Sequence, residues 1–256
     1  IANWNHFKEE FGEASHYAMP EVRQALSNGV FELVVCPLPK DKGAAASLKL
    51  KLTDKYAVQV TAKVAGLWGN DVSLHVELPD GESAASAKKF NLILKLNNAE
   101  IESHTLLNLG GNEEYKKLND GEEQDELFIS AINAKSSVIT TKIISVNSTT
   151  EELISKKERK LSAGKDALTV DYKDALKYLE DEDDVDMVVA SLSDASKSPD
   201  VYSAVIAHCE QMSKASKGRI GFGGIPNDKL DSFQSLVSDR FCKISPQDVL
   251  GAVVGK

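Results

Sequence analysis

This sequence is poor in the residues from which metal sites and crosslinks are built. It has 3 cysteines and 5 histidines in 256 residues, and it contains no Cys-x-x-Cys pair. Cys36, Cys209 and Cys242 are widely spaced and odd in number, a pattern typical of single thiols in a reducing compartment. No two histidines have the i, i+4 spacing of a helical metal site. The sequence therefore predicts neither a disulfide scaffold nor a metal site.

Long apolar runs and basic clusters are also missing. No apolar stretch approaches the roughly 20 residues that span a bilayer, and no signal-peptide pattern opens the chain. The 39 Asp and Glu outnumber the 30 Lys and Arg, which gives a net charge of −9 and is unsuited to binding nucleic-acid phosphates. Residues 156–160 are the one basic cluster, and Glu158 interrupts it. We expect neither a membrane nor a nucleic-acid partner.

What is present is an ordinary globular composition, with 42% hydrophobic and 27% charged residues, in a chain long enough for two cores. Between residues 56 and 146 the apolar residues alternate with polar ones, as in 72–78 and 90–96. Strict alternation places one face of a strand in a core and the other in solvent. The pattern predicts an antiparallel β-sandwich or barrel-like domain, with a short helix near residues 123–133.

Both ends of the chain have a different pattern. Residues 20–27 predict a helix that stops at the Asn28-Gly29 turn, and residues 31–36 predict a strand covered on both faces. From residue 161 helices alternate with strands, with helices around 172–179, 201–212 and 230–241 and strands at 185–190 and 219–222. Such alternation favours a mostly parallel sheet. We predict one discontinuous α/β domain (1–55 and 161–256) with the β-rich domain (56–160) inserted into it.

Three groups of residues invite a chemical interpretation, and none meets its requirements. His208 and Cys209 are adjacent on a predicted helix and point about 100° apart, so a hydrogen-bonded core histidine is the better interpretation. The acidic run at 180–186 lacks the glycine and ligand spacing of a calcium loop.

The third group is Gly218, Gly221, Gly223 and Gly224, which resembles a dinucleotide fingerprint without its spacing and is better explained as a turn at a strand end. No G-x-S-x-G elbow is present. The sequence predicts no catalytic, cofactor-binding or metal-ligating residue and no cofactor.

One corner of the sequence is distinctive. Residues 62–70 read Ala-Lys-Val-Ala-Gly-Leu-Trp-Gly-Asn between two strand-like stretches. Gly66 and Gly69 would permit positive φ, and Trp68 would fill the turn. Three further segments are distinctive: Trp4 to Gly12 and residues 20–36 before this corner, and Leu161-Ser162-Ala163-Gly164-Lys165-Asp166 after it. Together they resemble the tail sheath proteins of contractile bacteriophages.

The resemblance implies a structural protein that catalyses no reaction. It implies a subtilisin-like α/β domain without a catalytic site, and a subunit that polymerises around the tail tube and contracts on a baseplate signal to drive the tube through the host envelope. The location would be the virion tail, after assembly in the host cytoplasm. Because the chain begins at Ile1 and stops at Lys256 within an apolar run, we interpret it as a fragment without the terminal arms, and we expect it to be monomeric.

Two other functions remain open at this point. The chain could instead belong to the sheath of a related contractile machine, a bacteriocin or a type VI secretion system, which would contract by the same physical mechanism. A nucleotide-binding α/β enzyme is the alternative from a different class.

Overall fold

A computed structural model describes residues 1–38, 40–80, 87–146, 150–154, 157–193, 197–225, 244–245 and 249–255. Its contacts divide the chain into two compact units. The central unit comprises Gly12–Ala14 and Ala44–Lys165, and the split unit comprises Ile1–Phe11, Ser15–Gly43 and Asp166–Lys256. The divisions at 43/44 and 165/166 differ from the expected 55/56 and 160/161, since strand β1 (Ser47–Lys51) pairs along its whole length with β2 (Tyr56–Ala62).

The central unit contains two four-stranded sheets, ordered β6-β2-β1-β7 and β5-β4-β3-β8. All strand pairs in them are antiparallel except β1 with β7. This mostly antiparallel arrangement follows from the alternation in the sequence. The remaining strands of the unit are β3 (Val72–Glu77), β4 (Lys89–Leu96), β5 (Ala99–Asn108), β6 (Ile139–Ser145), β7 (Glu151–Glu152) and β8 (Arg159–Lys160).

Alternate residues of these strands form the core of the central unit. Val72 and Leu74 on β3 are fully buried, and so are Phe90 and Leu94 on β4. Helix α5 (Phe128–Lys135) contributes Phe128, whose ring meets that of Phe90 at 5.2 Å and 71°. The helix expected near 123–133 therefore exists, but it begins later. Helix α4 (Asn112–Asn119) and the 3-10 turn η2 (Leu67–Asp71) complete the unit.

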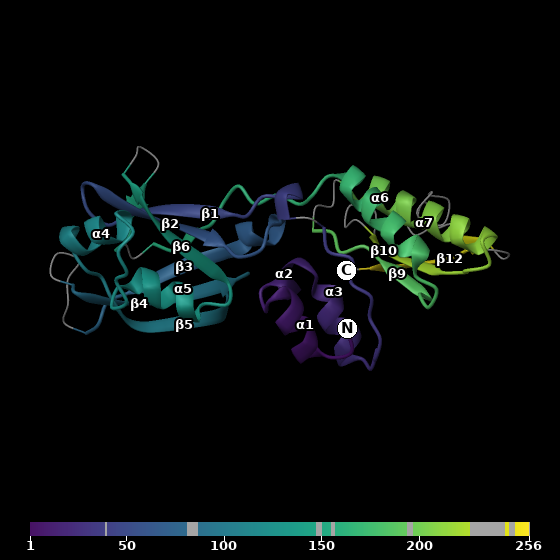
Figure 1. Ribbon diagram of the computed structural model, residues 1–256, viewed down its shortest axis with the longest axis horizontal. Coiled ribbons are helices and arrows are strands. Elements are labelled where there is room, and N and C mark those ends of the chain that lie inside the picture. The colour runs from purple at the N-terminus through teal and green to yellow at the C-terminus, as the bar shows by residue number, and fades with distance from the viewer. Residues whose placement is uncertain are drawn as a thin grey trace. The chain divides into compact units, whose positions relative to one another are not determined.

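The split unit contains a sheet of order β11-β12-β10-β9. Strand β10 (Ile220–Ile225) runs parallel to both β9 (Met187–Val189) and β12 (Val249–Gly255), while β11 (Ile244–Ser245) is antiparallel. Helices α6 (Thr169–Tyr178) and α7 (Ser198–Lys214) lie on the same side of this sheet (Figure 1). The unit also has α1 (Trp4–Phe11), α2 (Ser15–Ala18), α3 (Pro20–Ser27), η1 (Lys40–Lys42) and η3 (Leu179–Asp181).

Helix α7, with 17 residues, is the longest described helix of the split unit. Val201, Val205, His208 and Met212 are buried, which confirms the stripe predicted from the sequence. Val205 and Cys209 pack against Val188 of β9, and Leu176 of α6 and Leu179 of η3 join this cluster. The cluster explains why both helices lie on one face of the sheet. No helix among the described residues combines the length and apolarity needed to cross a bilayer.

Two predictions about the split unit were wrong. Residues 31–38 form neither helix nor strand, and Phe31 is 81% exposed because no neighbouring strand in the described part of the chain covers this segment. The glycines at 221, 223 and 224 lie within strand β10 and not in a turn at its end. The helix predicted at 230–241 falls outside the described residues.

Candidate functional site: the neck of the central unit

The long stretch of the central unit, residues 44–165, begins and ends in two segments that are hydrogen-bonded to each other. The Ala44 N–H donates to the Lys165 carbonyl at 2.8 Å, and the Lys165 N–H donates to that of Ala44 at 2.9 Å. Ser47 and Ser162 exchange a second pair of bonds, at 2.8 and 3.0 Å. We call these two segments, residues 44–47 and 162–165, the neck. Because the neck is closed, a force on either segment is transmitted to the same place on the unit.

The distinctive corner of the sequence, residues 66–70, is bonded to the neck. The Gly66 N–H donates to the Ala44 carbonyl at 3.1 Å. The Asn70 side chain makes two bonds to one residue: its amide donates to the Gly164 carbonyl at 3.0 Å, and its oxygen accepts the Gly164 N–H at 2.7 Å. Both segments are distinctive in the sequence, but no local pattern predicts their contact. Only the antiparallel pairing at the neck brings residues 94 positions apart together.

The glycines at this corner are required by close packing. A Cβ on Gly164 would lie 2.5 Å from the Gly66 carbonyl oxygen and 3.0 Å from Asn70 Oδ1, while a Cβ on Gly69 would lie 2.8 Å from Ala46 Cβ. Gly66 has φ +139° and ψ 162°, a region open only to glycine. Gly69 does not have the positive φ that the sequence suggested. Glycine is needed there because a side chain would collide with Ala46. Trp68 is 6% exposed and fills the corner as predicted.

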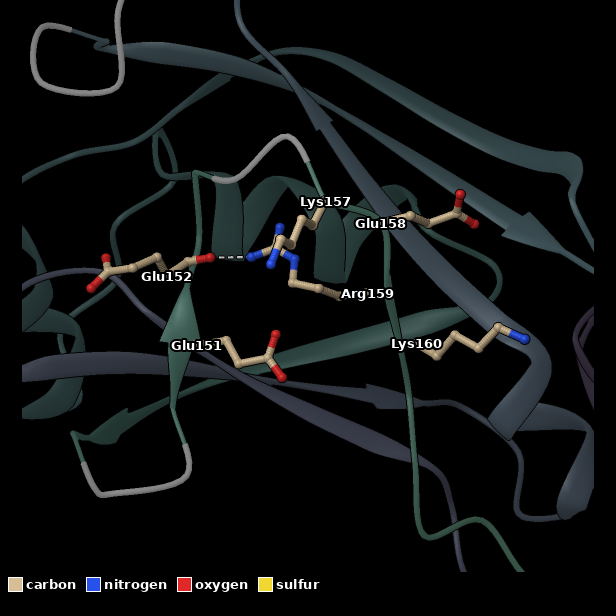
Figure 2. A pocket seen from close by; sticks show the side chains of 6 residues that line it. All are labelled: Glu151, Glu152, Lys157, Glu158, Arg159 and Lys160. Carbon is tan, nitrogen blue, oxygen red and sulfur yellow. Dashed lines mark hydrogen bonds between the residues drawn. The ribbon is translucent and has the colours of Figure 1, made fainter.

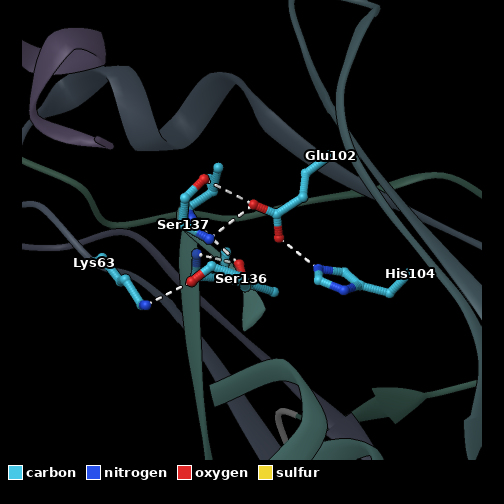
Figure 3. A network of polar contacts seen from close by, with 7 residues as sticks. Lys63, Glu102, His104, Ser136 and Ser137 are labelled. Atoms are coloured by element: carbon cyan, nitrogen blue, oxygen red, sulfur yellow. Dashed lines mark hydrogen bonds and ion pairs between the residues drawn. The ribbon is translucent and has the colours of Figure 1, made fainter. Parts of the chain in front are cut away.

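A second polar cluster in the central unit has the residue types of a hydrolytic triad, but in the wrong order (Figure 3). Glu102 accepts bonds from the Ser137 N–H and Oγ, both at 2.9 Å, and its other oxygen contacts His104 Nε2 at 2.5 Å. The carboxylate therefore separates the hydroxyl from the imidazole, whereas nucleophilic catalysis needs the imidazole beside the hydroxyl. Burial alone would raise the pKa of Glu102, but the bonds from Ser136, His104 and Ser137 outweigh it and lower the pKa.

This cluster joins strand β5 to the turn between α5 and β6. Lys63 Nζ donates to the Ser136 carbonyl at 2.5 Å, and Ser136 Oγ accepts the N–H groups of Val138 and Ile139 at 3.2 and 3.0 Å. These bonds satisfy buried backbone groups at the start of β6. The arrangement is structural: it fixes the turn and presents no activated nucleophile.

A shallow hollow of about 330 Å³ lies beside strands β7 and β8 (Figure 2). Its lining combines three acidic and three basic residues: Glu151, Glu152, Lys157, Glu158, Arg159 and Lys160. The buried Arg159 donates to the backbone carbonyls of Glu152 and Leu153, so its guanidinium braces two short strands. Because acidic and basic residues line the hollow in equal number, its described residues do not form a uniformly basic surface for an anion.

His208 is a hydrogen-bonded core histidine, as predicted. It is 4% exposed, and its Nε2 lies 2.8 Å from Arg219 NH1, which makes Nε2 the acceptor and the ring neutral. Burial, and then the neighbouring Arg219 charge, lower the pKa of His208. Burial raises the pKa of the Cys209 thiol to about 11. A protonated thiol without a facing base cannot act as a nucleophile.

The buried histidine makes stability dependent on pH. The pKa of His208 in the folded chain lies below its ordinary value of 6.5. As the pH falls below 6.5, the unfolded chain therefore becomes protonated at His208 before the folded chain does. We expect unfolding free energy to fall with decreasing pH in this window, by at most about 1.4 kcal/mol per pH unit. Denaturant titrations at pH 7 and pH 5 measure the loss, and His208→Gln should reduce it. An equal loss in wild type and variant would contradict this assignment.

The acidic run at 180–186 lies beside two basic side chains of the same chain. Asp183 pairs with Lys217 at 2.5 Å, Lys217 also donates to the Glu180 carbonyl, and Arg219 donates to that of Glu182. Among the described residues no group of three or more His, Cys, Asp or Glu side chains is arranged to hold a metal ion. The run therefore anchors the residues that lead into β10.

The glycines of β10 allow α7 to approach. A Cβ on Gly221 would lie 2.8 Å from Val205 Cγ1, and one on Gly223 would lie 2.9 Å from the Tyr202 ring. Gly221 and Gly223 face helix α7 and not an open strand end. Their role is therefore close packing of the helix on the strand, and not phosphate binding. This packing role was not predicted from the sequence, although the alternate spacing of Gly221 and Gly223 within a strand indicates one face.

No protein family description and no curated protein matches the chain. Solved structures that are similar include a sheath tail protein from Listeria innocua (19% identity, TM-score 0.36) and one from Desulfitobacterium hafniense (17% identity, TM-score 0.37). Each match covers 72% of this chain, which spans 34% and 35% of the two proteins, about a third of their length.

Proposed function

We propose that this chain is part of the structural subunit of a contractile bacteriophage tail sheath. The observation that carries the proposal is the neck. The Gly66–Asn70 corner and the 161–166 segment, which both carry the sequence resemblance, are bonded to each other through Asn70 and Gly164. Two segments that match one family and meet at one structural point are harder to explain by chance than either alone.

The proposed role of the neck is mechanical. A sheath subunit that contracts must move its domains without unfolding them. Closed by four backbone bonds and by Asn70, the neck would let the central unit move as one rigid body when either chain segment is pulled. Contraction energy would then reside in two alternative interface packings separated by a kinetic barrier.

The split unit would be the subtilisin-like domain of the family without a catalytic site. Its parallel strands β9, β10 and β12 and the helices α6 and α7 are compatible with this. The polar clusters of the described residues are used internally, as the Glu102 and Arg219 contacts show. We propose no reaction and no cofactor.

The partners follow from the proposal. In the complete protein, copies of the subunit would stack in rings around the tail tube protein and receive a signal from the baseplate. Contraction would drive the tube through the host envelope. The location would be the virion tail, assembled in the host cytoplasm, and the 256-residue chain would be monomeric on its own. Head-to-tail contacts that do not close into rings would extend the assembly as a helix.

Electron microscopy of the complete protein that contains this sequence tests the proposal. We expect helical tubes of two lengths and diameters, extended and contracted. A complete protein that stays monomeric at high concentration and low salt would contradict it. A thermal-shift screen with nucleotides and Mg²⁺ tests the enzyme alternative, since a ligand at 100 times its Kd would add about 2.7 kcal/mol of stability.

A further inference from the structure

The backbone pairing of the neck is interrupted halfway along it. Its two hydrogen-bonded pairs, Ala44 with Lys165 and Ser47 with Ser162, lie three residues apart in both segments. In a regular antiparallel ladder bonded and non-bonded pairs alternate, so bonded pairs recur at every second residue. A spacing of three requires a break between the two pairs. We call Ala44–Lys165, which lies at the boundary of the unit, the outer pair, and Ser47–Ser162 the inner pair.

The break in the ladder lies at Ala163. This residue has φ +66°, in the left-handed region, although it is not a glycine and its side chain is exposed. A side chain with a Cβ makes that conformation unfavourable. The peptide groups of the next residue, Gly164, are bonded to the side-chain amide of Asn70, which takes the place of a strand partner. The closed neck therefore holds Ala163 in a strained conformation.

The inner pair is fixed to both sheets of the central unit. Ser47 belongs to β1, where it is in register with Thr61 of β2. On the other segment, Leu161 precedes Ser162 and is 1% exposed. The Leu161 N–H donates to the carbonyl of Val72, the first residue of β3, at 2.9 Å. Opening the inner pair therefore requires core residues of both sheets to be exposed.

The two sides of the outer pair are held differently. The Ala44 carbonyl also accepts the Gly66 N–H at 3.1 Å, which fixes Ala44 to the corner. Lys165 is exposed, and residues 163–165 are followed at once by the boundary of the unit. These three residues can therefore lift away from Ala44 and Asn70 while the Gly66 bond and the inner pair stay in place. This movement releases Ala163 from its strained φ, which offsets part of the lost hydrogen bonding.

We propose that the neck is a two-stage clasp. Residues 163–165 detach first and reversibly, and the inner pair opens only when the central unit unfolds. The outer stage would yield to tension on the flanking chain and then close again, while the inner pair keeps the central unit rigid. The proposal goes beyond the proposed function and does not depend on the sheath assignment, because it concerns only how this chain responds to a pull at residues 44 and 165.

Native-state hydrogen exchange of the 256-residue chain, resolved by NMR, tests the two stages. We expect the amides of Ala44, Gly164 and Lys165 to share one protection factor, at least about tenfold lower than that of Ser47 and Ser162. Exchange of the first group should hardly depend on urea below the unfolding transition, since local opening exposes little surface. Equal protection and equal urea dependence of the two groups would overturn the proposal, because the neck would then open as one unit.

A core variant distinguishes local opening from global unfolding. Ile132 is 1% exposed on α5, and Ile132→Val removes one methyl group from the core without touching the neck. It should speed exchange at Ser47 and Ser162 about fivefold, the factor that corresponds to about 1 kcal/mol of lost core packing. Exchange at Ala44 and Lys165 should stay unchanged. An equal acceleration at all four amides would contradict the two-stage opening.

A glycine variant tests the strain at the break. Glycine adopts the left-handed region freely, so Ala163→Gly should slow exchange at Ala44 and Lys165 about fivefold, which corresponds to about 1 kcal/mol of relieved strain. The matched control is Ser216→Gly, which relieves a similar φ of +61° in the split unit and should leave these two amides unchanged. If Ala163→Gly has no effect on them, outer opening does not release Ala163 and the proposal is wrong.

Discussion

Gly164→Ala is expected to lower the unfolding free energy of the central unit by about 3 kcal/mol, since overpacking a tight site costs roughly 1 to 3 kcal/mol or more. The added methyl group would lie 2.5 Å from a backbone carbonyl oxygen, that of Gly66, and 3.0 Å from Asn70 Oδ1. A backbone atom cannot move aside as the end of a flexible side chain can, so the corner and the neck must separate. Urea denaturation followed by circular dichroism measures the change.

Two comparisons make that result specific. Gly218→Ala adds the same methyl group where the nearest atom is 3.9 Å away, so its effect should stay within about 0.5 kcal/mol. Asn70→Ala removes both bonds to Gly164 and should cost about 2 kcal/mol. The double variant should lose less than the sum, because both changes break one contact. Strict additivity, or a neutral Gly164→Ala, would show that the corner does not hold the neck.

The second large effect concerns excision of the central unit. A polypeptide of residues 44–165 is expected to fold on its own, with a cooperative transition and an unfolding free energy of roughly 5 kcal/mol or more. Its first and last residues are already hydrogen-bonded to each other, and its core strands pair only among themselves in the described part of the chain. Circular dichroism and a dispersed amide NMR spectrum report folding.

A shorter fragment, residues 48–161, provides the control. It lacks both neck segments, their four backbone bonds and the fully buried Ala46. We expect it to be less stable by at least about 4 kcal/mol, at about 1 kcal/mol for each of the four bonds within the neck. The Gly66 bond to Ala44 and the two Asn70 bonds to Gly164 are lost as well. If the two fragments are equally stable, or if 44–165 is unfolded, the neck does not close the unit and the rigid-body role proposed for it fails.

Much of the secondary structure could be predicted from local patterns. The period-two alternation around Leu74 and Phe90 specifies half-buried strands, and helix α3 occupies the residues, Pro20–Ser27, that its starting proline and the following Asn-Gly turn indicate. These features depend on neighbours a few residues apart, which is why the sequence alone indicates them. The strand expected at 31–36 is wrong for the complementary reason: its apolar residues are real, but a strand needs a partner from elsewhere in the chain.

The candidate site depended on long-range contacts. Asn70 and Gly164 are 94 positions apart, and the local sequence around either residue does not predict that the two are in contact. The glycines of β10 were noticed as a group, but their purpose became clear only when α7 was seen to pack on two of them.

The sequence by itself determined many of the strands and helices, the absence of recognisable catalytic motifs, and the family that the chain resembles, because side-chain periodicity and residue type act over short distances. The tertiary structure alone decided that the chain closes on itself at the neck, that Glu102 stands between Ser137 and His104, and that α6 and α7 lie on the same side of their sheet. Each of these depends on strand register and on the side of a sheet to which a helix packs. Both are set by the burial of apolar surface across the whole unit and not by any local pattern.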